Sequence, residues 1–453
     1  MRAIRLRPTK PTGLVVLAIA AVLASLILGT TWALADGQGH SDHSGSAAGA
    51  RPDNPVACTG KVLTPLSNVQ LAINKAPAGT TFCFRPGVYH VSSLIPRSHD
   101  VLNGENRRAV LDGQHQAFFA IGSESFAPGP SDVTVEGFVI QHYNTPVQRG
   151  AIQDYNGPGW IIKNNHITNN TAAGVATGNN VRVLDNLIDH NGQEGFSAHG
   201  NGGLYQGNVI AYNNESLGVN PGWEAGGGKA YATRNLTFRD NNVHNNGGPG
   251  LWADTNNIYT TYVGNTISDN WGPGIYEEIS YNATIVDNTI TGNGMPSSPG
   301  GGNKQGWAWD AGIQLRESGS ISRSHPLTIS GNIVTDNYNG ISLIQSPPSG
   351  CGPRGGAYGP CNVQNVLVEN NWITMTQGAT GAYQDGAGDG IFTTQHNVFR
   401  DNHYCVSSAA HPNDGYSFGW LAWLNTWPDF STWQITWLET GGTFTVSHSA
   451  CRP

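Results

Sequence analysis

The chain has 453 residues, of which 60 are glycine and only 12% are charged. With 23 lysine and arginine residues against 31 aspartate and glutamate residues, its formal net charge is −8 at pH 7. The length exceeds what one compact core needs and predicts either two domains or an elongated repeat fold. The low charge excludes a charged disordered protein, and the acidic balance argues against nucleic acid as a partner.

Residues 1–35 have the features of an export signal. A basic start, "MRAIRLRPTK", precedes the apolar "GLVVLAIAAVLASLILG", and residues 33–35 have the small-x-small form that signal peptidase cleaves. The apolar run over 13–35 approaches bilayer-spanning length, so a retained membrane anchor is the alternative. Both interpretations predict an exported protein, either secreted or held on the outer side of a membrane. The Gly-, Ser- and His-containing residues 36–56 are predicted to form a flexible linker.

All six cysteines lie in the part predicted to be exported. An even number of cysteines outside the cytoplasm predicts disulfides, although six cysteines allow fifteen connectivities. Pairing each cysteine with its neighbour closes the shortest loops and gives Cys58–Cys83, Cys351–Cys361 and Cys405–Cys451. The sequence contains no CxxC motif, so a metal knuckle or redox motif has little support.

A repeat of about 22 residues organises residues 57–405. An asparagine, one further residue and then Val or Ile recur at positions 165, 186, 208, 241, 265, 288, 332 and 371. Each repeat holds short β-branched runs between Asn and Gly, with no segment of helical periodicity. Such a period predicts a solenoid, and these strands predict a parallel β-helix. Its stacked coils would align the asparagines so that their side chains hydrogen-bond to one another.

The repeat, together with "VQLAINKAPAGTTFCFRPGVYH" and "VLNGENRRAVLDGQ", resembles the pectin-lyase-like superfamily, especially parallel β-helix repeat proteins of the nitrous-oxide-accessory (NosD) type. The resemblance covers roughly residues 60–405 and implies an all-β, right-handed, single-stranded parallel β-helix. It implies no single activity, because the superfamily includes lyases, hydrolases, epimerases and non-enzymes. The Trp-Ile-Asp-His run of its pectate lyases is absent, and only "SAHGN" around His199 is faintly similar to a polygalacturonase motif.

Residues 406–453 depart from the repeat and are predicted to form a C-terminal cap. "GYSFGWLAWLNTWPDFSTWQITW" contains five tryptophans, which would cover the open end of the core. Exposed tryptophans that stack on sugar rings are the alternative.

Two similar phrases, "NGGPGLWADTNN" and "NWGPGIYEEISYN", define the register of neighbouring coils. The aliphatic residue directly after Gly is expected to point inward. The second and fourth residues after Gly are therefore expected to point outward. One predicted outward column contains Lys229, Trp252, Tyr276 and Gln314. The column beside it contains Tyr231, Asp254, Glu278 and Arg316.

These columns hold the densest charge in the repeat, and Lys229, Asp254, Glu278 and Arg316 are the candidate catalytic residues. Acids in adjacent coils would lie near 5 Å apart, which suits a retaining glycosidase. The flanking Lys and Arg suit β-elimination from a uronic acid, in which cations or Ca²⁺ neutralise the carboxylate.

The candidate substrate-binding residues are Glu224, Trp252, Tyr276 and Gln314. Trp252 and Tyr276 are expected to form a stacking platform for sugar rings. Insertions at 220–228 and 295–310 are expected to wall a groove beside the columns, and 346–361 to form a further disulfide-closed loop. The alternative is that these charges form a solvent-exposed ladder of ion pairs, which has no binding role and contributes little to stability.

The sequence thus predicts a monomeric, exported enzyme that cleaves a polysaccharide or cell-wall glycan as a lyase or a hydrolase. A non-catalytic surface protein that binds glycan, or has a structural role, is the alternative. A metal-delivery accessory role, implied by the NosD resemblance, has no Met or Cys cluster to hold copper. No metal ligand set is predicted, and Ca²⁺ enters only through the elimination mechanism.

Overall fold

The computed structural model describes residues 58–123, 128–154, 156–303, 308–347, 351, 355–375, 379–407, 417–420, 429–436, 439–447, 451 and 453. The predicted export segment and linker lie outside the described residues. Among the described residues, no helix combines the length and apolar character of a membrane span.

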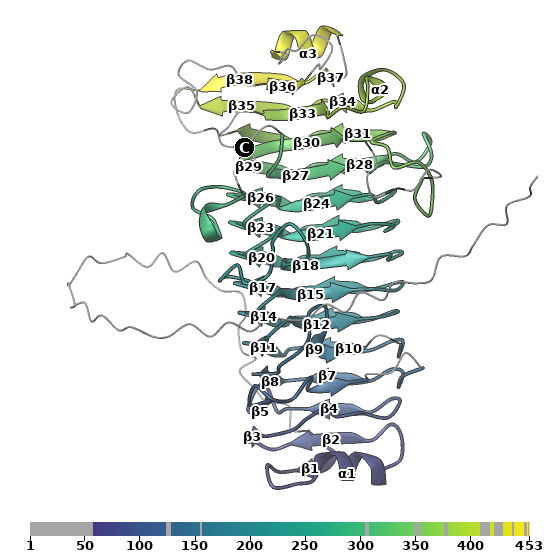
Figure 1. Ribbon diagram of the computed structural model, residues 1–453, viewed down its shortest axis with the longest axis vertical. Coiled ribbons are helices and arrows are strands. Elements are labelled where there is room, and N and C mark those ends of the chain that lie inside the picture. Colours follow the sequence, from purple (N-terminus) through teal and green to yellow (C-terminus); the bar gives the residue numbers. More distant parts are fainter. Residues whose placement is uncertain are drawn as a thin grey trace, which may run out of the picture. The chain divides into compact units, whose positions relative to one another are not determined.

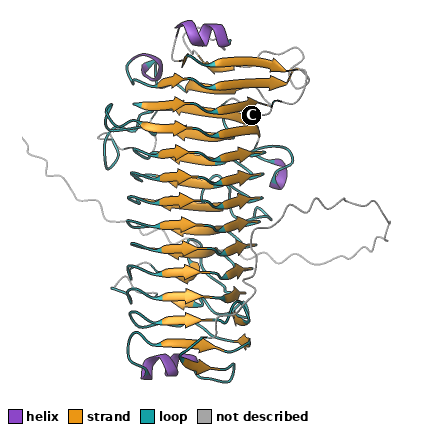
Figure 2. Cartoon of the chain, turned by 180° about the vertical axis from the view of Figure 1, so that it is seen from behind, coloured by secondary structure: helices purple, strands orange, loops and turns teal. Residues whose placement is uncertain are grey.

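The described strands form three parallel sheets, and successive coils add one strand to each sheet (Figure 1). The sheets have 14, 13 and 11 strands, and we call them the first, second and third sheet. Strands of each sheet lie stacked along the axis with short turns between the sheets, as the view from behind also shows (Figure 2). The predicted all-β parallel β-helix is confirmed.

The strand bounds follow the repeat along the whole described chain. The first sheet contains β1 (Lys61–Leu63), β2 (Thr81–Phe84), β4 (Val101–Asn103), β7 (Thr134–Glu136), β10 (Ile161–Lys163), β13 (Arg182–Leu184), β16 (Leu204–Gln206), β19 (Thr237–Arg239), β22 (Thr261–Val263), β25 (Thr284–Val286), β28 (Leu327–Ser330), β31 (Val366–Glu369), β34 (Val398–Arg400) and β37 (Glu439–Thr440). The second sheet contains β3 (Gly87–Tyr89), β5 (Ala109–Asp112), β8 (Phe138–Gln141), β11 (His166–Thr168), β14 (Leu187–Asp189), β17 (Val209–Ala211), β20 (Asn242–His244), β23 (Thr266–Ser268), β26 (Thr289–Thr291), β29 (Ile333–Asn337), β32 (Trp372–Met375), β35 (His403–Ser407) and β38 (Thr443–Ser447). The third sheet contains β6 (Ile121–Gly122), β9 (Gly150–Gln153), β12 (Ala173–Thr177), β15 (Glu194–Ala198), β18 (Gly226–Tyr231), β21 (Leu251–Asp254), β24 (Ile275–Glu278), β27 (Ala311–Arg316), β30 (Asn339–Gln345), β33 (Ala379–Gln384) and β36 (Ser417–Trp420).

The core is a set of columns, because in-register stacking places equivalent inward residues on top of one another. In the first sheet the buried inward column is Leu102, Val135, Ile162, Val183, Tyr205, Phe238, Tyr262, Ile285, Ile329, Val368 and Phe399. Each short strand therefore buries its central side chain against those of the coils on either side.

An asparagine ladder runs along the turns between the first and second sheets. Its side-chain amides donate to the carbonyl of the next asparagine at 2.9 to 3.1 Å. The ladder contains Asn165, Asn186, Asn208, Asn241, Asn265, Asn288, Asn332, Asn371 and Asn402. Eight of these were expected from the sequence. Asn402 is the ninth, and its amide meets the Glu439 carboxylate at 3.3 Å, which ends the ladder.

The residue before each ladder asparagine makes the sharp turn. It has a positive φ in every coil of the ladder, for example 52° at Asn164, 54° at Asp185 and 67° at Gly264. Only Gly, Asn and Asp occupy this position, and these residues tolerate left-handed backbone best. This turn accounts for part of the Gly, Asn and Asp content of the sequence.

A second asparagine ladder lines the turns between the second and third sheets. Its members are Asn170, Asn191, Asn213, Asn246, Asn270, Asn293 and Asn337. They are linked at 2.8 to 3.0 Å. The sequence analysis did not single out this set, although the expected side-chain hydrogen bonding applies to it equally.

Helices lie at the two ends of the stack (Figure 1). α1 (Val69–Lys75) buries Val69 and Ile73 on the first coils, and Asn68 caps it by accepting from the Leu71 N–H at 3.0 Å. At the other end, α3 (Phe430–Thr436) packs Trp433 on Phe399 with ring centroids 5.0 Å apart.

The predicted Trp-rich cap lies largely outside the described residues, which omit 408–416 and 421–428. Two shorter helices, α2 (Gly390–Thr393) and the 3₁₀-helix η1 (Pro299–Gly301), lie in insertions. The disulfides are Cys58–Cys83, Cys351–Cys361 and Cys405–Cys451, which is the neighbour pairing expected from the sequence.

Replacing a ladder asparagine should destabilise the coil on each side. In Asn265→Ala the backbone N–H and the side-chain amide of Asn241 lose their acceptor, at 3.0 and 2.9 Å, and the Phe238 carbonyl loses its donor. Leaving such buried groups unpaired costs about 1 to 3 kcal/mol each, so we expect a loss of at least about 3 kcal/mol in the free energy of unfolding. Chemical denaturation measures it. The exposed Asn74→Ala should change it by less than about 0.5 kcal/mol, and equal effects would contradict the role of the ladder.

A carboxyl group lies inside the core at Glu277, whose register partners Ala253 and Leu315 both point inward. Glu277 is fully buried, and the Tyr262 hydroxyl is the polar group that acts on its carboxyl group. Burial raises its pKa to about 8, against a smaller opposing effect of the Tyr262 hydroxyl. Glu277 is therefore protonated in the folded protein at neutral pH.

Glu277 should make the protein less stable as the pH rises. Between about pH 4.5 and 8 the unfolded chain ionises this carboxyl and the folded chain does not, which costs about 1.4 kcal/mol per pH unit. We expect Glu277→Gln to gain stability over the natural protein by roughly 4 kcal/mol from pH 4 to pH 9. Denaturation at a series of pH values tests this. A pH-independent difference between Glu277→Gln and the natural protein would refute the assignment.

Candidate functional site

The third sheet aligns the outward columns as expected. Register pairing joins Lys229, Trp252, Tyr276 and Gln314 in one column. It joins Tyr231, Asp254, Glu278 and Arg316 in the column beside it. The four strands that carry them, β18, β21, β24 and β27, are consecutive in the sheet.

Lys229 binds the carboxylate of the adjacent coil. Its Nζ lies 2.7 Å from Oδ2 of Asp254 and 3.8 Å from Oε2 of Glu224, and it donates to the Trp223 carbonyl at 2.8 Å. The lysine is only 6% exposed, so these contacts replace its hydration. A buried charge kept in such a setting needs its partners, and the lysine holds Asp254 in one orientation.

Glu278 forms a second ion pair, with Arg316 of its own column. Its Oε1 lies 2.8 Å from Nη1 of Arg316, and the guanidinium also contacts Ser346 at 3.2 Å and Glu317 at 3.4 Å. Burial raises the pKa of Glu278, as does the negative charge of Asp254, and Arg316 opposes them. Glu278 thus keeps a proton to higher pH than an ordinary glutamate.

Asp254 and Glu278 are direct register partners on neighbouring strands, which lie about 4.8 Å apart. Asp254 pairs with a lysine, and Glu278 has a raised pKa. Pairs of carboxyl groups with different environments divide acid and base roles between them. This arrangement can donate a proton from one group and present an anion from the other.

Trp252 and Tyr276 lie deeper than expected. They are 3% and 7% exposed, and their rings stack on each other with centroids 5.3 Å apart and planes inclined by 17°. The Lys229 Nζ lies 4.1 Å from the Trp252 ring centroid. Neighbours in the column cover most of both rings, which form the floor of the site, and their role as a stacking platform for sugars stays a prediction.

Glu224 and Gln314 also take positions at the edge of the floor. Glu224 lies in the insertion at 220–228 and accepts a hydrogen bond from Gln148 Nε2 at 2.5 Å. Gln314 is 1% exposed and its side-chain carbonyl accepts from the Asp310 N–H at 3.0 Å. Gln314 therefore holds Asp310, at the end of the second insertion, and its role in binding substrate stays a prediction.

A groove of about 670 Å³ lies over this floor. Lys229, Asp254 and Glu278 line it, and the insertion at 220–228 forms one wall. Trp223 and Tyr231 also line the groove, and each is 48% exposed. These two aromatic side chains, rather than Trp252 and Tyr276, offer surface for contact with a ligand. Tyr231 was placed in the column from the sequence but was given no role, and Trp223 was missed.

His199 and Arg149 line the other end of the groove and were not selected from the sequence. His199 follows Ala198, which pairs with Ala230, so extending the predicted column by one coil would have found it. Burial lowers the pKa of His199, and Arg149 adds to this effect, so the imidazole is neutral at neutral pH. Arg149 precedes β9, where the repeat gives no signal for its side-chain direction.

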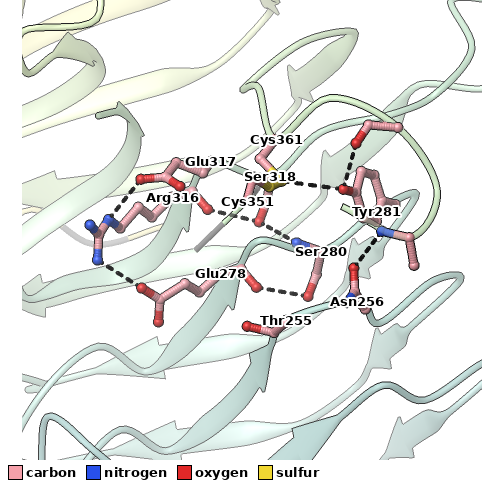
Figure 3. The surroundings of a disulfide bond; sticks show 12 residues. Thr255, Asn256, Glu278, Ser280, Tyr281, Arg316, Glu317, Ser318, Cys351 and Cys361 are labelled. Atoms are coloured by element: carbon pink, nitrogen blue, oxygen red, sulfur yellow. Dashed lines mark hydrogen bonds and ion pairs between the residues drawn. A yellow bond between two sulfur atoms is a disulfide. The ribbon is translucent and has the colours of Figure 1, made fainter. Parts of the chain in front are cut away.

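The disulfide-closed loop at 346–361 braces the end of the site (Figure 3). Tyr281 donates to the Gly359 carbonyl at 3.0 Å, and its hydroxyl lies 3.4 Å from the Cys361 sulfur. The Asn256 side chain accepts from the Ala357 N–H at 2.8 Å. Asn256 and Tyr281 lie in the turns that follow the strands β21 and β24, so the loop fixes the turns that leave the two carboxyl-bearing strands.

Hydrogen bonds also link the ion pair to this brace (Figure 3). Ser280 donates to the Glu278 carbonyl at 2.9 Å and its N–H donates to Ser318 Oγ at 3.0 Å. Ser318 in turn donates to the Arg316 carbonyl at 2.9 Å. The backbone carrying the Glu278–Arg316 pair is therefore tied across two coils.

Removing the Cys351–Cys361 bond should loosen the brace and leave the stack folded. Closing a loop with a sequence separation of 10 stabilises it by about 3 kcal/mol in the chain-entropy account. In Cys351→Ser/Cys361→Ser we expect the Ala357 and Tyr281 amides to exchange hydrogen about tenfold or more faster. Amides of β12 and β15 serve as the internal control. Unchanged exchange at Ala357 would show that the disulfide does not hold the loop.

The described residues contain no cluster of three or more His, Cys, Asp or Glu side chains placed to hold a metal ion. The basic side chains in the groove already neutralise its carboxylates, so these residues do not fit a resident Ca²⁺ ion. We assign no step to a metal.

Comparisons with known proteins agree on the fold. Residues 150–324 match the family model described as "Right handed beta helix region". The A-module of the Azotobacter vinelandii mannuronan C-5 epimerase AlgE6 superposes with a TM-score of 0.60 at 19% identity, covering 85% of this chain and 97% of that one. The AlgE4 A-module from the same organism gives 0.54 at 15% identity, covering 84% and 94%. A complex of XylC with xylose gives 0.53 at 11%, covering 83% and 82%. No curated protein matches the sequence.

Proposed function

We propose that this right-handed parallel β-helix protein cleaves a polysaccharide bound along the groove, with Asp254 and Glu278 as the reacting carboxyl pair. The observation that carries the proposal is their register pairing in one groove with different partners, a lysine for Asp254 and burial for Glu278. Proteins of the same fold include mannuronan epimerases and a protein bound to xylose, which is compatible with a saccharide ligand.

Hydrolysis of a glycosidic bond uses the two groups as follows. Glu278 donates its proton to the glycosidic oxygen as that oxygen leaves the anomeric carbon, and Asp254 faces the carbon that becomes electron-deficient. A water molecule then gives its hydroxyl to the anomeric carbon and its proton to Glu278. Lys229 and Arg316 orient the carboxyl groups and balance their charge, which makes them positioning residues. They were expected from the sequence to be catalytic.

Elimination from a uronate is the second candidate, and the other end of the groove favours it. A neutral His199 there is suited to remove the C5 proton. Arg149 lines the same end and would neutralise the uronate carboxylate. The half-exposed Tyr231 lies within ring-contact distance of His199, with centroids 6.2 Å apart.

Export belongs to the same proposal. Three disulfides suit an oxidising compartment, and residues 1–35 would supply the signal or a membrane anchor. The partner of the exported protein would be an extracellular or cell-wall glycan, with the protein acting as a monomer. A glycan-binding protein without turnover is the remaining alternative.

Removing either reacting carboxyl group should abolish cleavage. We expect Asp254→Asn and Glu278→Gln each to lower activity at least about 100-fold, the usual contribution of acid–base groups. Reducing-sugar release measures hydrolysis, and absorbance at 235 nm measures elimination, on neutral and uronate polysaccharides. Activity should also fall as the pH rises through the raised pKa of Glu278, because the proton is then lost.

Matched controls break ion pairs of the same kind on the first sheet of the β-helix, away from the groove. Glu369→Gln removes a Glu–Arg pair with Arg400, and Glu136→Gln removes a 2.7 Å pair with Lys163. Both should keep full activity. If Asp254→Asn and Glu278→Gln also keep it, the site assignment is wrong, and loss only in His199→Gln would favour elimination. Binding of a glycan with no turnover by the natural protein would favour the non-catalytic alternative.

A further inference from the structure

A second cavity of about 290 Å³ adjoins the groove on its Arg316 side. The two cavities share Gly222, Trp252 and Glu278 as lining residues. Glu278 therefore stands at the boundary between a larger space and a smaller one. At this size the smaller cavity lies at the lower limit of small-ligand sites, about 300 to 1,000 Å³.

The walls of the smaller cavity are aromatic and apolar. Trp271 and Trp309 are both half-buried, so part of each indole remains accessible. Pro249 and Pro273 come from the two Gly-Pro-Gly turns of neighbouring coils, and Pro221 comes from the insertion at 220–228. Flat indole and proline surfaces pack against the C–H faces of sugar rings.

Polar groups occupy one side of this cavity. Asn303 donates to Asp310 Oδ1 at 2.5 Å, and the Asp310 N–H donates to Gln314. These groups lie in or against the second insertion, and amide and carboxylate groups suit hydrogen bonds to sugar hydroxyls. Asp310 is 1% exposed and already accepts from Asn303, so the described residues on this side of the cavity offer no cation to a ligand carboxylate.

The positive charge in this cavity is already satisfied. Arg316 pairs with Glu278 at 2.8 Å and with Glu317 at 3.4 Å, and its guanidinium lies 5.6 Å from the Trp309 ring centroid. The arginine thus holds one side of the Trp309 wall in place instead of presenting a free cation. Among the described residues that line the cavity, the chemistry that remains is aromatic and hydroxyl-binding, with no unpaired cation to attract an anion.

We infer that this cavity is a subsite for one uncharged pyranose ring of the polysaccharide, immediately beside Glu278. The inference rests on the proposed function for its ligand class. The larger groove takes the rest of the glycan, so the scissile bond lies at the boundary that Glu278 marks.

The test measures binding in an Asp254→Asn background, where turnover does not interfere and the Glu278–Arg316 pair stays intact. The probes are cello-, xylo- and mannohexaose, with hexamers of mannuronate and galacturonate, titrated by calorimetry. We expect at least one neutral hexamer to bind, and Trp309→Ala or Trp271→Ala to weaken it about tenfold. Trp309→Phe should keep most of the affinity, because a flat ring remains.

A control tryptophan separates local from general effects. Trp372→Ala, on β32 of the second sheet, should leave the dissociation constant unchanged, and circular dichroism checks that each variant is folded. The inference is overturned if no neutral hexamer binds, if only uronates bind, or if Trp309→Ala and Trp271→Ala bind within twofold of the parent. The proposed cleavage is tested separately, by the activity of the natural protein. If a neutral hexamer binds and the natural protein does not cleave it, the cleavage proposal fails and the inferred subsite stands.

Discussion

In-register stacking of the coils is the constraint on which the rest of the molecule depends. Each coil buries too little by itself, and it is held by the parallel hydrogen bonds and core contacts of the coils on either side. The two asparagine ladders extend this dependence to the turns, since each side-chain amide is completed only by its neighbour. A coil cannot slip by one residue without moving its inward side chains outward.

The same constraint makes a site out of ordinary surface positions. Outward residues of the third sheet are covered above and below by their register partners, which explains why Lys229 and Glu278 are buried although they point away from the core. Charges placed in this way must pair along the axis, and they do so between adjacent coils. Insertions can leave only at turns, and there they build walls over the paired charges without disturbing the stack.

The fold and the columns could be predicted from the sequence because both follow from a period. The spacing of the asparagines set the coil length, and the two Gly-Pro-Gly phrases set the register that places Asp254 beside Glu278. How far each outward side chain is buried could not be predicted from the period. Whether Trp252 is a platform or a floor depends on what covers it, and Lys229 and the insertions are long-range neighbours. Arg149 and Trp223 were missed for the same reason, since both lie in segments outside the strands.

The placement of the disulfides has a mechanical consequence. Cys58–Cys83 joins the first coils, and Cys405–Cys451 joins the last ones, with sequence separations of 25 and 46. A solenoid stretched by its chain ends peels from those ends, because terminal coils have one neighbour instead of two. Here a pulling force would pass through the two disulfides and bypass the chain between their cysteines. The outermost coils would therefore not extend under that force. Peeling would then have to begin in the interior, where each coil is held on both sides.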